Sequence, residues 1–197
     1  MEKKIIALAG SPRRRGNTGL LLEAAVKGAR DAGAEVDVIY TNSLRIKPCQ
    51  GCNTCSKLAG CIYQDDMVDL IAAFEAADAF IVSSPVYFGS VSAQLKTVID
   101  RCQALWMQRQ RILLEQDSIL GRKPGLFLAT SGHPNHKGTR FDSSLEVVRT
   151  FGYAVDMKLI GTVFAADTDR IPVTEDAPIL LEAYKAGRKL AEAIDSK

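Results

Sequence analysis

Four of the five cysteines in this chain lie close together, at the spacing C-x2-C-x2-C-x5-C. Thiolates placed two residues apart can wrap around one compact metal centre, as in the cysteine runs of bacterial ferredoxins. The longer step before the fourth thiol lets all four serve one [4Fe–4S] cluster. The predicted metal ligands are therefore Cys49, Cys52, Cys55 and Cys61.

The same cysteines are also compatible with a zinc site, a redox-active thiol set without metal, or purely structural thiols. Structural zinc is typically held by two separate C-x2-C pairs with a longer spacer between them. Here the pairs overlap and share Cys52, which favours the iron–sulfur interpretation. The fifth cysteine, Cys102, lies on the apolar stripe of an expected helix and is interpreted as a buried packing residue.

A second candidate site is the turn at residues 10–18, which reads GSPRRRGNT between a strand-like run and a helical pattern. A helix N-terminus offers free N–H groups and the positive end of its dipole to an anion. The turn lacks both the G-x-G-x-x-G dinucleotide pattern and the G-K-[ST] ending of an ATP loop. Its hydroxyls, amide and arginine suit a terminal monophosphate such as that of FMN, although a solvated turn capped by Asn17 or Thr18 is the alternative.

The elements that must position these residues alternate between strand-like and helix-like segments, which is typical of an α/β protein with a parallel sheet. One helix is expected to begin after Asp65 or Asp66, either of which can cap it. Another is expected to begin after the cap Ser92 and to run through Trp106. Residues 107–122 are too long for a plain connection and suit a helix extension, a lid or a subunit contact. Strands are expected at residues 4–9, 35–40, 79–83, 125–131 and 157–164, and further helices at 17–32, 141–151 and 177–194.

The bulk composition indicates one domain over residues 1–197, with a cysteine-rich loop at 42–64. The chain is 47% hydrophobic and 24% charged, and its net charge of +2 makes no general case for nucleic acid or membrane binding. No run approaches the ~18 apolar residues of a membrane span, and the MEKK start lacks a secretory signal. The expected location is the cytoplasm, where disulfides are rare.

Residues 84–96, SPVYFGSVSAQLK, with Asp100 and Arg101 soon after, closely resemble the second flavin loop of the NAD(P)H-dependent FMN reductase family. The turn at 10–18 resembles the phosphate loop of that family, and ATSG at 129–132 resembles its third flavin segment. The cysteine spacing resembles that of the iron–sulfur flavoproteins, a branch of the same family.

This resemblance implies a flavodoxin-like, doubly wound, five-stranded parallel sheet in a three-layer α/β/α arrangement. FMN would lie at the carboxyl ends of the strands, where ligands of open α/β sheets generally bind. Around the phosphate, the resemblance implies Ser11, Arg13, Asn17 and Thr18. Along the isoalloxazine and its pyrimidine edge it implies Pro85, Val86, Tyr87, Phe88, Gly89, Thr130, Ser131 and Gly132.

Three functions fit these features. The first is an oxidoreductase that moves electrons between a [4Fe–4S] cluster and FMN, with a ferredoxin-like donor and a small-molecule acceptor. The second is an NAD(P)H-dependent FMN or quinone reductase without a cluster, and the third is a non-enzymatic flavodoxin-like electron carrier. No catalytic side chain is expected, because the flavin carries the chemistry.

Two further expectations concern assembly and the only histidines. The resemblance implies a homodimer or homotetramer with clusters near subunit interfaces. His133 and His136 lie in the loop after the fourth expected strand and are interpreted as solvated side chains.

Overall fold

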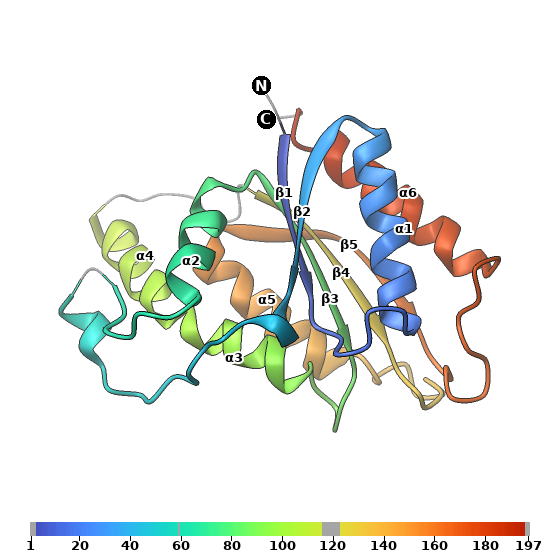
Figure 1. The fold of residues 1–197 in the computed structure, drawn as a ribbon, viewed down its shortest axis with the longest axis horizontal. Helices are drawn as coiled ribbons and strands as arrows, with labels where there is room; N and C mark the ends of the chain where they lie inside the picture. Colours follow the sequence, from blue (N-terminus) through green and yellow to red (C-terminus); the bar gives the residue numbers. More distant parts are fainter. Residues whose placement is uncertain (1–2, 59, 116–122, 196–197) are drawn as a thin grey trace.

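The computed structural model describes residues 3–58, 60–115 and 123–195, and its centre is one five-stranded sheet. The strands are all parallel and follow the order β2-β1-β3-β4-β5 (Figure 1). This is the flavodoxin-like order, with its switch point between β1 and β3, and it confirms the predicted fold class. The strands are β1 Lys3–Ala9, β2 Ala34–Tyr40, β3 Ala79–Pro85, β4 Lys123–Thr130 and β5 Met157–Ala165.

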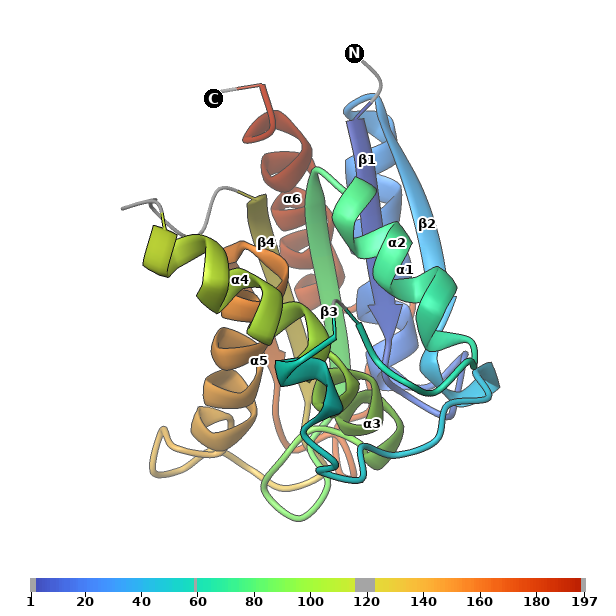
Figure 2. The ribbon, with the colours of Figure 1, turned by 90° about the vertical axis from the view of Figure 1, so that its left-hand side faces the viewer.

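Helices cover both faces of the sheet and complete the predicted three layers. Figure 2 shows α2 and α4 in front of the strands and α1 and α6 behind them. Helices α3 and α5 lie on the same side as α2. The helices are α1 Asn17–Asp31, α2 Met67–Ala76, α3 Ala93–Arg101, α4 Gln103–Glu115, α5 Asp142–Val155 and α6 Pro178–Glu192, with short 3-10 turns η1 Thr41–Ser43 and η2 Thr54–Ser56.

Alternate residues of each central strand enter two separate cores, because successive side chains of a strand point to opposite faces. On the α2–α5 side, Phe74, Phe80 and Phe151 pack edge to face with ring centroids 5.7 to 6.4 Å apart. On the α1–α6 side the core is aliphatic, including Ile5, Ile81 and residues of both helices. Continuous apolar strands such as β3 are therefore needed to fill both layers.

The helix predicted to run from Ser92 through Trp106 is interrupted, which corrects the expectation of one long helix. Helix α3 ends at Arg101, and the N–H of Cys102 donates to the carbonyl of Ile99 at 3.0 Å before α4 begins. Cys102 itself is buried as predicted. Of residues 107–122, those up to Glu115 extend a helix, and 116–122 lie outside the described residues.

No helix within the described parts of the chain is long and apolar enough to cross a membrane.

Helices α1 and α6 approach closely through a reciprocal pair of glycines. A Cβ atom at Gly28 would collide with the carbonyl of Tyr184 on α6, and one at Gly187 would collide with the carbonyl of Ala25 on α1. Each helix therefore lays its backbone against a glycine of the other. The contact holds α1 in place on the sheet, and α1 carries the predicted phosphate loop at its N-terminus.

We expect Gly28→Ala to lower the free energy of unfolding by about 1–3 kcal/mol, because the added methyl group overpacks a backbone contact. The matched control is Gly161→Ala on β5, where the new Cβ would meet only a side-chain atom of Leu126 at 3.4 Å. That variant should stay within about 0.5 kcal/mol of the parent. Urea denaturation of the two variants measures the difference, and equal stabilities would contradict the packing account.

Candidate functional site

The three segments predicted to hold a flavin come together at the carboxyl edge of the sheet and are tied by hydrogen bonds. The hydroxyls of Thr18 and Thr130 lie 2.6 Å apart and join the first segment to the third. The N–H of Val86 donates to the carbonyl of Thr130 at 2.7 Å, which joins the second to the third. The hydroxyl of Ser92 donates to the carbonyl of Gly10 at 2.5 Å and joins the second to the first.

The turn at residues 10–18 leaves the N-terminus of α1 without a side-chain cap. Helix α1 is preceded by Gly16, and no described side chain accepts from its first N–H groups. Asn17 instead accepts the N–H of Val173 at 3.0 Å through its side-chain oxygen, so the alternative of a capped turn is wrong. A Cβ at Gly19 would collide with the carbonyl of Arg14, which is why the turn can fold so tightly onto the helix.

The charged side chains of this turn divide between two environments. Arg13 and Arg14 are both exposed, but the guanidinium of Arg14 lies over the ring of Tyr40, 4.0 Å from its centroid. Ser11 accepts the N–H of Arg13 at 3.2 Å and fixes the start of the turn. Free helix N–H groups beside an exposed arginine form a site suited to a phosphate.

The second segment ends in a tight turn with unusual backbone angles. Tyr87 and Ser90 exchange backbone hydrogen bonds of 2.8 and 3.0 Å, and the two residues between them, Phe88 and Gly89, both have positive φ, 49° and 79°. This conformation suits glycine but costs a bulky residue on the order of 1–3 kcal/mol. Phe88 is nevertheless fully exposed. An exposed aromatic ring on a strained backbone at this edge points to a binding role.

The cysteine-rich segment is an expanded connection between β2 and α2. All four predicted ligands are free thiols, and they line one cavity of about 40 Å³ together with Tyr63 and Arg101. Positive φ angles at Gly51 and Asn53 curl the segment around the cavity. Within the described residues, no three histidine, cysteine or acidic side chains are gathered so as to hold a metal ion.

The thiols differ in their surroundings. The hydroxyl of Thr54 donates to the sulfur of Cys52 at 3.4 Å and lowers the pKa of that thiol. Burial raises the pKa of Cys55, and the three neighbouring thiols add to the effect through their charge.

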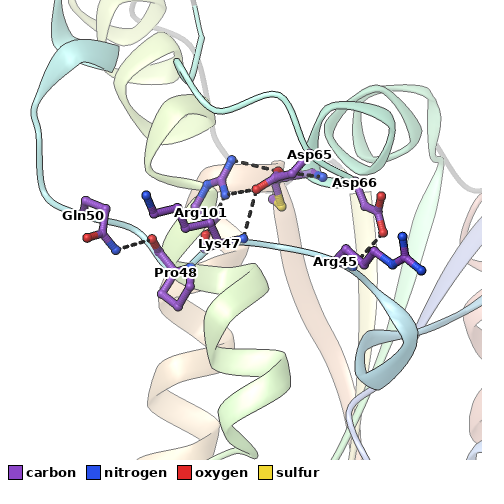
Figure 3. Close-up of polar contacts among 8 residues, drawn as sticks. Arg45, Lys47, Pro48, Gln50, Asp65, Asp66 and Arg101 are labelled. Atoms are coloured by element: carbon purple, nitrogen blue, oxygen red, sulfur yellow. Dashed lines mark hydrogen bonds and ion pairs between the residues drawn. The ribbon is translucent and has the colours of Figure 1, made fainter.

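An ion pair between Asp65 and Arg101 joins the two ends of this segment, its neck, where the chain enters at Lys47 and leaves at Asp65 (Figure 3). The guanidinium of Arg101, with its side chain only 1% exposed, donates to both carboxylate oxygens of Asp65 at 2.6 and 3.1 Å and to the carbonyl of Lys47 at 2.7 Å. Asp65 also accepts the N–H of Lys47 at 3.0 Å. The stretches of chain that enter and leave the cysteine-rich segment, at Lys47 and Asp65, are thus both joined to α3 through Arg101.

Asp65 makes a contact of the kind predicted for a helix cap, and it has a further role as well. It does accept the N–H of Met67 at 3.2 Å, but its main partner is Arg101. Burial favours the neutral acid, yet the hydrogen bonds from Arg101 and Lys47 outweigh it and hold the pKa of Asp65 below its usual value. Asp66, in contrast, makes no side-chain cap hydrogen bond and instead accepts the N–H of Arg45 at 2.7 Å.

The two histidines lie on the surface, as predicted, but they share a cavity. Its volume is about 600 Å³, and it reaches the strained turn at Gly89. Asn135 accepts the N–H of Arg140 at 2.9 Å and shapes the loop. The remaining lining residues are His133, Pro134, Asn135, His136, Lys137, Thr139, Arg140 and Ser143, so the described lining is basic and has no carboxylate.

The structure brings only some of the predicted flavin residues into a cavity. Ser11 and Arg13 line a cavity of about 370 Å³ along α1 and β2, and Gly89 lines the basic one. The other predicted residues lie at the same edge of the sheet through the links described above. Neither of these two cavities is lined by residues of all three segments.

Sequence reasoning missed the segment after β5. Thr168 donates both its N–H, at 3.0 Å, and its hydroxyl, at 3.2 Å, to the carbonyl of Ser131. The N–H of Asp167 donates to the carbonyl of His133 at 3.0 Å. The signal was present, since polar residues that follow a parallel strand lie at the ligand-binding edge.

Comparisons with known proteins found relatives both by sequence and by fold. The sequence profile described as NADPH-dependent FMN reductase matches residues 3–170. An iron-sulfur flavoprotein of Archaeoglobus fulgidus is 33% identical over 98% of this chain and 81% of its own length. One of Methanocaldococcus jannaschii is 41% identical over 52% of this chain and 53% of its own. The NAD(P)H:quinone oxidoreductase from Methanothermobacter marburgensis superposes with a TM-score of 0.69 at 20% identity, covering 96% of each chain.

We expect Phe88→Asn to stabilise the flavin-free chain by about 1 kcal/mol, because asparagine tolerates positive φ better than phenylalanine. The same change should weaken FMN binding, because it removes the exposed ring. Phe88→Leu is the control, since it also removes the ring but keeps a bulky side chain at positive φ. Chemical denaturation and FMN titration of both variants measure the effects, and equal stability of the two would show that the turn is not strained.

Proposed function

Because this chain belongs to the NADPH-dependent FMN reductase family, in its iron–sulfur flavoprotein branch, we propose that it transfers electrons between a [4Fe–4S] cluster and FMN. Family membership makes the chain an FMN-binding flavoprotein and a flavin-dependent oxidoreductase, which argues against a non-enzymatic carrier. The observation that carries the cluster half of the proposal is that four free cysteines line the same cavity.

The residues around that cavity fit a cluster in their chemistry. Cysteine thiolates are the usual ligands of such clusters, and Cys49, Cys52, Cys55 and Cys61 would supply all four. The cavity is also lined by the buried cation Arg101, which suits the negative charge of a thiolate-ligated cluster. When bound, the cluster supplies single electrons and FMN accepts or releases them singly or in pairs.

The residues at the carboxyl edge fit FMN in the same way. The uncapped first turn of α1, with Ser11 and Arg13, would bind the phosphate through N–H groups and positive charge. Asn17 and Thr18 would contribute through their backbone and through the links that hold the turn in place. The isoalloxazine would lie along residues 85–89, with its pyrimidine edge at 130–132.

The arrangement of the two sites favours an assembly of several copies. In Figure 1 the cysteine-rich segment lies at the left, outside the helices, whereas the loops after β1, β3 and β4 converge at the bottom. Electron transfer would then run from the cysteines of one subunit to the flavin of another in a homodimer or homotetramer. Leu58 and Ile62, which are large and exposed within the cysteine-rich segment, would be covered by such a contact.

The partners follow from the chemistry. A ferredoxin-like protein would deliver single electrons to the cysteine site, and a small molecule would receive electrons from the flavin. We place this reaction in the cytoplasm, a reducing compartment where clustered thiols stay free of disulfides. Neither catalytic acid nor base is required of the chain, because the flavin carries the chemistry.

The composition of the protein tests this proposal. We expect anaerobically purified protein to contain about four iron and four sulfide per chain, together with FMN, and Cys55→Ala to lose iron and keep FMN. Chemical analysis of iron, sulfide, zinc and FMN measures this, with the visible spectrum. FMN accompanied by zinc, or by no metal, would overturn the cluster half of the proposal.

The basic cavity at residues 133–140 favours a second candidate function, NAD(P)H-dependent reduction of the flavin. Cavities of 300–1,000 Å³ suit small molecules rather than flat protein surfaces, and this one measures about 600 Å³ beside Gly89. Lys137 and Arg140 would bind the phosphates of the dinucleotide while its nicotinamide lay on the flavin. Binding by charge and shape needs no glycine fingerprint.

We expect the double variant Lys137→Gln/Arg140→Gln to raise KM for NADPH by about tenfold or more, because charge-assisted hydrogen bonds are lost. Flavin reduction by dithionite should be unchanged. The matched control is Lys158→Gln, an exposed cation on β5 away from the cavity. Steady-state NADPH oxidation gives both constants, and a parent protein that does not oxidise NADPH would exclude this candidate.

A further inference from the structure

Arg101 is buried more deeply than an arginine usually is, and its hydrogen bonds are incomplete. Arginine is rarely buried without full pairing, and here the residue is only 2% exposed. Its two terminal nitrogens bind Asp65 and the carbonyl of Lys47. Its third nitrogen, Nε, is buried without a partner among the described residues.

An unpaired buried donor is costly, because it has lost its bond to water and gained nothing in return. Native structures therefore rarely keep one unless a ligand, ion or water completes it. Arg101 lines the cavity that holds the four thiols. The group that completes its hydrogen bonding is thus expected in that cavity.

The ion pair of Arg101 and Asp65 has a definite orientation toward the cavity that the four thiols line. Arg101 is among the residues that line the cavity, whereas its partner Asp65 is not, so the positive member faces the thiols. The guanidinium group of arginine stays protonated in proteins at every physiological pH. The cation next to the cysteines is therefore permanent.

We propose that Arg101 is a positioning residue of the cluster site, which anchors the neck of the cysteine-rich segment and directs its free Nε–H and its charge at the Cys61 side of a bound cluster. This inference rests on the proposed function. Hydrogen bonds to the sulfurs and local charge set the reduction potentials of iron–sulfur clusters. A facing cation stabilises the more negative, reduced state and so makes the potential more positive.

The two members of the ion pair give predictions of opposite sign. Arg101→Gln removes the positive charge and should shift the midpoint potential of the cluster to more negative values. Asp65→Asn leaves the positive charge unbalanced and should shift the midpoint potential to more positive values. Both variants weaken the same structural contact, so a merely structural role would move the potential in the same direction or leave it unchanged.

Two more variants control for folding and for charge. Arg101→Lys keeps the charge without the forked geometry, and we expect it to retain a potential closer to the parent than Arg101→Gln. Lys96→Gln removes an exposed cation of the same helix, which pairs with Asp100 at 2.7 Å, and should leave the potential unchanged. Circular dichroism verifies that each variant folds. If Arg101→Gln does not fold, the potentials of Arg101→Lys and Asp65→Asn still test the proposal.

Potentiometric titration of the anaerobically prepared proteins, followed by electron paramagnetic resonance, measures the midpoint potentials. Opposite shifts for Arg101→Gln and Asp65→Asn would support the assignment. Shifts of the same sign, or none, in variants that bind a full complement of iron would overturn it and leave the proposed function intact. A parent protein without iron would overturn the proposed function, and this inference with it.

Discussion

All five strands run in the same direction, and the rest of the site depends on this constraint. Every strand-to-helix connection then leaves from one edge of the sheet. The phosphate turn after β1, the cysteine-rich segment after β2, the strained turn after β3 and the segments after β4 and β5 are all such connections. One topological choice thus gathers residues distant in the sequence, while the two apolar layers beneath hold the edge rigid.

At that edge, short polar links turn separate loops into one surface. The hydroxyl pair of Thr18 and Thr130 is buried, as is Ser92, so these bonds do not compete with water. They leave the helix N–H groups and the exposed ring of Phe88 available. The cysteine-rich segment is held differently: two of its four cysteines are exposed and two are partly buried, and its anchor is the ion pair of Asp65 and Arg101.

Much of the fold could be predicted from the sequence, because apolar periodicity reports directly on burial. The strands and five of the helices follow from it, as does the cap at Ser92, which accepts the N–H of Leu95. The break at Cys102 could not be predicted, because the apolar stripe continues through it and only local backbone angles change. The pairing of Asp65 with Arg101 was equally hidden, since the two residues are distant in sequence and a carboxylate before a helix normally indicates a cap. The roles of Thr168 and of the basic cavity depend on which loops meet in space.

We propose that electrons reach the flavin through the cysteine site, so the rate of flavin reduction by ferredoxin, followed by stopped-flow spectroscopy, should depend on those cysteines. Reduced ferredoxin would be mixed anaerobically with the FMN-loaded parent and with FMN-loaded Cys55→Ala, and flavin reduction followed by its absorbance. We expect fast flavin reduction in the parent and much slower reduction in the variant, with the same rate in both when dithionite is the donor. Equal rates with ferredoxin would contradict the account, because the flavin would then be reduced without the cysteines.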